Sequence, residues 1–98
     1  DGTNLLGSYA KANITTKTTT VIKASAGILH SIVINNPTGV WTAALCDNAT
    51  NCATGTFATI APTTGVTPVT LIYDTTFTNG LSIVTTGTTM GDITVTYN

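Results

Sequence analysis

The chain contains no glutamate, no glutamine and no arginine, and only 7% of its 98 residues are charged. These three residue types are strong helix formers, so their absence argues against an α-helical fold. A small soluble domain usually keeps roughly a quarter or more of its surface charged. With a net charge of only −1, this chain must cover its surface with hydroxyl groups or with neighbouring proteins.

The scarcity of positive charge also limits the partners that the chain can have. Its cationic side chains are Lys11, Lys17, Lys23 and a single histidine, His30. Binding to phosphate groups needs clustered lysine or arginine, so we expect no nucleic-acid partner. The apolar runs are too short to cross a bilayer and no basic amphipathic helix is visible, so we expect no membrane partner either.

Threonine is the most conspicuous residue that is present, at 25 of the 98 positions. β-branched side chains fit a pleated strand better than a helix. Seven to eight short apolar runs follow one another at spacings of roughly 8–12 residues, with turn signals between them, which is typical of a sandwich or barrel. The sequence therefore predicts an all-β fold, an antiparallel β-sandwich of jelly-roll-like or Ig-like topology.

Alternation within these runs predicts which side chains share a face. One run predicts a common face for Ile28, His30, Ile32 and Ile34. The next predicts a face of Trp41, Ala43 and Leu45, and the last a face of Ile93, Val95 and Tyr97. Residues 1–20 are polar and weakly patterned, so we expect an extended N-terminal arm there and a single β-sandwich domain over residues 21–98.

Residues suited to catalysis are few and far apart in the sequence. His30 has no aspartate near it in sequence, and a general base usually needs an orienting carboxylate. We expect a buried or interface histidine that is hydrogen-bonded to a backbone group. Asp47, Asp74 and Asp92 stand at strand boundaries, where aspartate ordinarily forms turns. The sequence thus predicts a protein that is not an enzyme, with no catalytic residues, metal site or cofactor.

The two cysteines, Cys46 and Cys52, have only His30 as a further zinc ligand of the Cys/His type, so zinc is not expected. A disulfide between them would close the loop CDNATNC and add about 2 kcal/mol by the chain-entropy estimate. Two free thiols would suit assembly in a reducing cytoplasm, and the sequence leaves both states open. Five aromatic residues lie on apolar alternations and are expected mostly in the core: Trp41, Phe57, Tyr73, Phe77 and Tyr97.

The stretches TVIKASAGILHSIVINNPTG, PVTLIYDTTFTNGLSIVTTG and DITVTYN resemble, in this order, segments of small bacteriophage virion structural proteins. The likeness covers residues 20–98 and concerns β-domain proteins that decorate heads or lie in tails. The chain departs from the pattern at Cys46–Cys52. The resemblance implies a capsid decoration or stabilising protein that contacts the major capsid protein or other virion proteins. It further implies a homo-oligomer located in the virion after assembly in the host cytoplasm.

Two other functions fit the same composition. The chain could be a carbohydrate- or receptor-binding module of a tail or cell surface. It could also be an exported subunit of a surface filament, in which the N-terminal arm would be donated as a strand to a neighbour.

Overall fold

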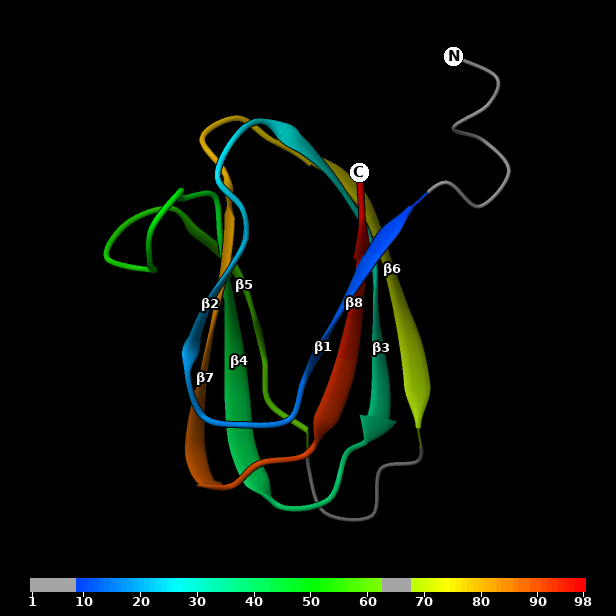
Figure 1. The fold of residues 1–98 in the computed structure, drawn as a ribbon. Coiled ribbons are helices and arrows are strands. Elements are labelled where there is room, and N and C mark those ends of the chain that lie inside the picture. Colours follow the sequence, from blue (N-terminus) through cyan, green and yellow to red (C-terminus); the bar gives the residue numbers. More distant parts are fainter. Residues whose placement is uncertain (1–8, 63–67) are drawn as a thin grey trace.

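The computed structural model describes residues 9–62 and 68–98, which form eight strands and no helix (Figure 1). No helix in these two segments could cross a membrane. The prediction of an all-β sandwich is confirmed. The strands are β1 (Ala10–Ile14), β2 (Thr19–Lys23), β3 (Gly27–Asn36), β4 (Val40–Cys46), β5 (Thr56–Ile60), β6 (Val69–Phe77), β7 (Leu81–Thr89) and β8 (Asp92–Tyr97).

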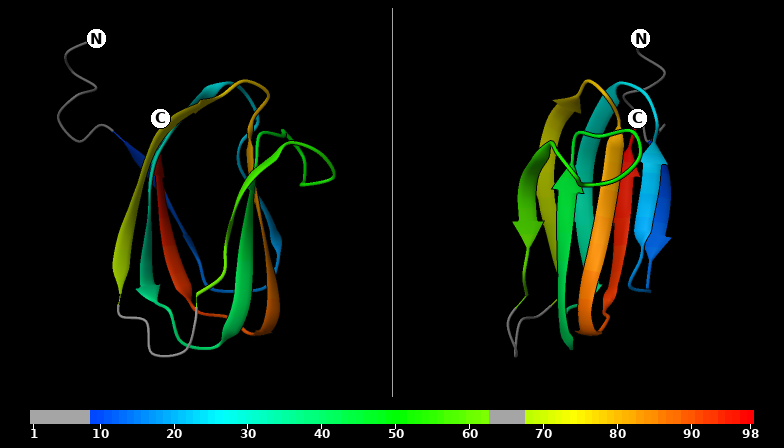
Figure 2. Two further views of the ribbon diagram at one scale, coloured as in Figure 1. Left: turned by 180° about the vertical axis from the view of Figure 1, so that it is seen from behind. Right: turned by 90° about the vertical axis from the view of Figure 1, so that its left-hand side faces the viewer.

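The strands form two antiparallel sheets that face each other (Figures 1 and 2). Sheet A has the order β1-β8-β3-β6 and sheet B has the order β2-β7-β4-β5. The first strand therefore pairs with the last, the second with the seventh, the third with the sixth and the fourth with the fifth. This nested pairing is a jelly roll. It differs from an Ig-like sandwich, in which the first, second, fifth and fourth strands share a sheet.

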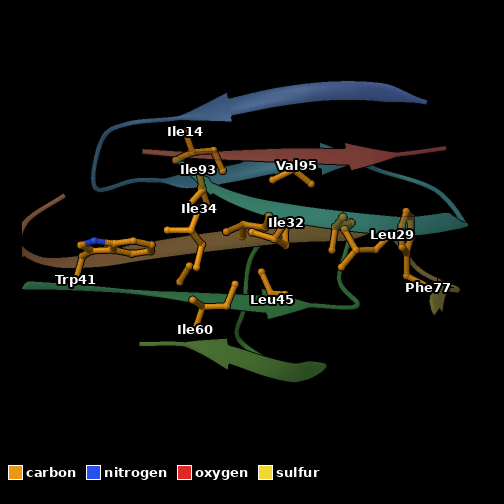
Figure 3. Close-up of a cluster of buried hydrophobic side chains, with 13 residues drawn as sticks. Ile14, Leu29, Ile32, Ile34, Trp41, Leu45, Ile60, Phe77, Ile93 and Val95 are labelled. Carbon is orange, nitrogen blue, oxygen red and sulfur yellow. The ribbon is translucent and has the colours of Figure 1, made fainter. Parts of the chain in front are cut away.

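The core lies between the sheets and is built by alternation along the central strands (Figure 3). Trp41, Ala43 and Leu45 all point inward from β4, as the sequence predicts, and so do Ile93 and Val95 from β8. Every buried side-chain nitrogen or oxygen in the described residues has a hydrogen-bond partner. Burial of these branched side chains from both sheets is the main force that holds the two layers together.

The predicted faces of β3 are wrong in part. Leu29, Ile32 and Ile34 are buried in the core, whereas Ile28 is exposed on the outer side. The register between β3 and β8 shifts between Leu29 and Ser31, so that β3 has one extra residue at His30. Inward and outward positions repeat every two residues, so one extra residue exchanges the two faces for the residues that precede it, Ile28 and Leu29.

The predicted boundary between arm and domain at residue 20 also needs correction. Ala10–Ile14 pairs along its whole length with β8, and Thr19–Lys23 pairs with β7. The link between them is anchored as well, since the buried Thr85 hydroxyl donates to the Thr16 carbonyl at 2.6 Å. Residues 10–20 thus belong to the sandwich, because β1 is an edge strand of sheet A and β2 is an edge strand of sheet B. Residues 1–8 lie outside the described part.

Candidate functional site

The loop between β4 and β5 is closed by a disulfide between Cys46 and Cys52, whose Cα atoms lie 5.4 Å apart. It crosses the upper ends of β4 and β7 (Figure 2, right). The Ser82 hydroxyl of β7 donates to the Asn48 carbonyl at 2.7 Å. Within the loop, the Asn48 side-chain oxygen accepts from the Thr50 N–H at 2.9 Å. The loop therefore covers one end of sheet B, and its cysteines have a structural role.

Asp47 organises a second turn, between β6 and β7. Its carboxylate accepts from the backbone N–H of Thr78 at 3.0 Å and of Asn79 at 2.8 Å, and from the Thr78 hydroxyl at 3.1 Å. These hydrogen bonds, those from the Thr78 backbone most of all, hold the pKa of Asp47 below its ordinary value of 3.8. The sequence predicts a turn-forming aspartate here, but it could not show that the turn is 31 residues further along the chain.

We expect the stability of the protein to fall in acid because of Asp47. A carboxyl whose folded pKa is lowered stabilises the fold above its unfolded pKa, and this contribution disappears as the pH falls through the folded value. The Asp47→Asn variant should melt below the wild type at neutral pH, and the two melting temperatures should converge below pH 3.8. Calorimetry across this range checks the prediction. Parallel pH profiles for the two proteins would contradict it.

His30 and Asp74 form a pair on the outer side of sheet A. The His30 Nδ1 and an Asp74 carboxylate oxygen lie 2.5 Å apart, and the Tyr9 ring stacks on the imidazole with centroids 4.3 Å apart. Asp74 has φ of 46°, at the point where the register between β3 and β6 shifts. The expected backbone partner of His30 is therefore wrong. A carboxylate holds this ring, because bulges in two neighbouring strands bring the residues together.

This pair is not joined to a nucleophile by the adjacent serine. The Ser31 hydroxyl instead lies 2.6 Å from the Thr96 hydroxyl on β8 and is hydrogen-bonded to it. The remaining carboxylate of sheet A, Asp92, accepts from the Asn13 amide at 2.6 Å and from the Asn35 amide at 3.1 Å. It links β1, β3 and β8. In residues 9–62 and 68–98, no three His, Cys, Asp or Glu side chains lie together as metal ligands.

The aromatic side chains divide between core and surface. Trp41 and Phe77 are only 3% and 1% exposed, as the sequence predicts, and Tyr73 and Tyr97 pack partly buried against the core. Phe57 is 40% exposed and is therefore an exception to the prediction that most of these aromatic residues lie in the core. It stands on β5 at the edge of sheet B, next to the register shift between β4 and β5. At the edge, no further strand covers it.

The most unusual surface is the outer side of sheet B, which we call the uncharged face. Along each strand, its residues alternate with inward-facing residues such as Ala43, Leu45 and Ile83. Across the strands they pair with one another, as Ala44 does with Thr59 and Val84. The four strands of sheet B contain one charged residue, Lys23 at the end of β2, whereas those of sheet A contain Lys11, Asp74, Asp92 and His30. The uncharged face comprises Val21, Val40, Thr42, Ala44, Thr59, Val84 and Thr86.

A depression of about 520 Å³ lies at the end of the uncharged face that is opposite the disulfide loop. Its lining combines Val40, which is 68% exposed, with Thr42, Thr86, Ala61 and Pro62. Trp41 also borders it, but this residue is only 3% exposed and its indole N–H donates to the Thr38 carbonyl at 3.2 Å. The depression is apolar and contains no ionisable group.

Neither the uncharged face nor the depression has a direct signal in the sequence. The uncharged face could have been found by assigning charged residues to sheets, but this needs the strand order. Comparison with protein-family models, with curated proteins and with solved structures found no match for this chain.

Proposed function

We propose that this chain is a non-enzymatic structural protein of a virus particle, a capsid decoration protein that acts through protein–protein contacts. The observation that carries the proposal is the uncharged face of sheet B. It presents valine, alanine and threonine side chains, and none of its seven residues is ionisable. Depletion of charge is the compositional mark of the core of a protein–protein interface. Such a surface is unusual on a domain that stays alone in water.

The construction of the domain supports the same role. The first and last strands pair with each other, a disulfide closes the longest described loop, and the buried polar groups in the described residues are hydrogen-bonded. Pairing of this kind opposes local opening of β1 and β8. Jelly rolls occur in viral capsid proteins and also in lectins, so the topology is compatible with the proposal without selecting it.

The partner that fits this surface is the major capsid protein or another virion protein. The chain has three lysines, on β1, on the β1–β2 link and on β2, which are few for the clustered positive charge that nucleic acid needs. An uncharged face with a depression at one end instead suits a complementary protein surface. The resemblance to small phage virion proteins over residues 20–98 points to the same class of partner, and with it to a location in the virion.

The second candidate is a carbohydrate- or receptor-binding module, and the depression beside Val40 favours it. A small apolar hollow with two threonine hydroxyls could accept a sugar ring. Sugar-binding sites stack rings on exposed aromatic faces, however, and Trp41 is 3% exposed. We therefore rank this function second. The filament subunit ranks third, because β1 already completes its own sheet and is not available for donation.

Charge introduced into the uncharged face should prevent attachment to particles. In a Val40→Lys variant, the ammonium group would be desolvated at the interface, so we expect binding to be at least about tenfold weaker. Val40 is 68% exposed, so the fold itself should tolerate the change. Virus particles are purified from the source culture, and this protein is stripped from them. The measurement is co-sedimentation of each purified variant with these stripped particles. Copies per major capsid subunit are counted by quantitative mass spectrometry.

The matched control is Thr76→Lys, at an exposed position of sheet A. It adds the same charge and should bind as the wild type does. Equal binding by both variants would remove the uncharged face as the attachment surface. Absence of the protein from native particles, together with a specific signal on a glycan array, would replace the proposal with the carbohydrate-binding function.

A further inference from the structure

The free edge of sheet A is a second surface with the character of an interface. β6 is the edge strand of this sheet and, with nine residues, is longer than the other edge strands β1, β2 and β5, which have five each. Within the described residues, nothing pairs with its outer side (Figures 1 and 2). An edge strand presents unpaired N–H and C=O groups, and proteins usually protect them with charge, proline or a bulge.

The first half of β6 has none of these protections. Val69 to Tyr73 contains no charge and no proline, and Val69 to Ile72 pairs with β3 in regular register. Ile72 is 61% exposed and points outward, whereas Phe77, at the end of the same strand, points into the core. The irregularity follows Ile72: Tyr73 and Asp74 lie between the pairs Ser31–Ile72 and Leu29–Thr75, and Asp74 has φ of 46°. By contrast, β1 carries Lys11, and β2 carries Lys23 and a register shift.

We propose that two copies of this chain associate through β6, edge to edge, around a two-fold axis centred on Leu71. Antiparallel pairing of residues 69–73 with the same residues of the second copy would join the two A sheets into one continuous sheet. In this register Thr70 of each copy lies across from Ile72 of the other copy. The two Ile72 side chains are then diagonal neighbours on the same face, close enough for contact between β-branched side chains.

Charge and backbone geometry select this register and this occupant. All five paired residues precede Asp74, and four of them, Val69 to Ile72, are in regular register with β3. The two Asp74 carboxylates lie outside the paired segment at opposite ends, so no like charges face each other. A register centred on Asp74 would bring the two carboxylates together and is disfavoured. The association uses sheet A, so it leaves the uncharged face of sheet B free and does not depend on the proposed attachment.

The first test compares Ile72→Lys with Thr76→Lys in sedimentation equilibrium over the micromolar to millimolar range. The wild type and Thr76→Lys should form dimers. Ile72→Lys places two ammonium groups at the centre of the pairing, so its dimer dissociation constant should rise at least about tenfold. Ile72 is 61% exposed, so the variant should fold, and a matching melting temperature verifies this. A monomeric wild type, or a dimer that Ile72→Lys leaves intact, would overturn the proposal.

The second test checks the register by cross-linking. The Thr70→Cys/Ile72→Cys variant should form an interchain disulfide on mild oxidation, since residues two apart on one strand are too distant to bond with each other. The control Thr94→Cys/Thr96→Cys has the same spacing on the interior strand β8 and should remain uncross-linked. Cross-linking in both variants, or in neither, contradicts the pairing.

The outcomes also separate this inference from the proposed function. A dimer that forms normally but does not bind particles would refute the decoration role alone. Particle binding by a protein that is monomeric at all concentrations would refute the dimer alone. If Ile72→Lys abolished particle binding while the wild type stayed monomeric, the β6 edge would take a strand from another protein, and the second copy would be wrong.

Discussion

Replacing Gly87 with alanine is expected to destabilise the protein by at least about 3 kcal/mol. Gly87 has φ of 138°, a conformation that residues with a side chain rarely adopt. It lies across from Trp41, where the register between β4 and β7 shifts. A Cβ atom at this position would stand 2.1 Å from the Val40 carbonyl oxygen and 2.5 Å from the Trp41 Cα. Both obstacles are backbone, so β4 itself would have to move away from β7.

Urea denaturation of Gly87→Ala measures this effect, and Thr88→Ala is the control at the exposed neighbouring position. The control should change the free energy of unfolding by less than about 0.5 kcal/mol. Because the same backbone borders the depression beside Val40, Gly87→Ala should also weaken any contact made there. Equal stability of the two variants would show that the close approach of β4 and β7 does not need glycine.

Replacing Phe77 with alanine is expected to cost about 3–5 kcal/mol, the range measured for fully buried aromatic residues. Phe77 is 1% exposed and ends β6 opposite Gly27 of β3. An added Cβ on Gly27 would stand 2.8 Å from the Phe77 ring, so the ring lies directly over the glycine. Removal of the ring would leave a cavity, and Gly27 on the neighbouring strand β3 has no side chain that could fill it.

Phe57→Ala is the matched control because it removes the same ring from a position that is 40% exposed on an edge strand. We expect a loss of less than about 1.5 kcal/mol for this variant. Chemical denaturation of both proteins measures the difference. Similar losses for the two phenylalanines would contradict the assignment of Phe77 to the core and Phe57 to the surface.

The two proposed surfaces divide the molecule in a way that suits an assembled shell. Under the two proposals, sheet B would provide the uncharged face for attachment, and sheet A would provide the uncharged first half of β6 for pairing between copies. Of the ionisable Lys, His and Asp side chains in the strands, only Lys23 lies in sheet B, and Lys11, His30, Asp74 and Asp92 lie in sheet A. There they form local hydrogen bonds, such as those from the Asn13 and Asn35 amides to Asp92. We expect the outer side of sheet A to face solvent in the assembly.

Local properties of the sequence were sufficient to predict the class of fold and much of the core. Threonine, valine and isoleucine favour strands wherever they stand, and alternation shows which side chains share a face as long as the strand is regular. Trp41, Leu45, Ile93 and Val95 were assigned correctly for this reason. The spacing of Cys46 and Cys52 allowed a short disulfide, but their redox state could not be decided from spacing alone.

Only the tertiary structure decided which strands pair, because pairing depends on contacts between residues far apart in the sequence. It selected a jelly roll over an Ig-like sandwich and placed residues 10–14 beside β8 rather than in an arm. A single extra residue at His30 moved Leu29 into the core and turned the imidazole toward Asp74, 44 residues away. No local pattern records such a bulge, since it arises from the register that two neighbouring strands impose.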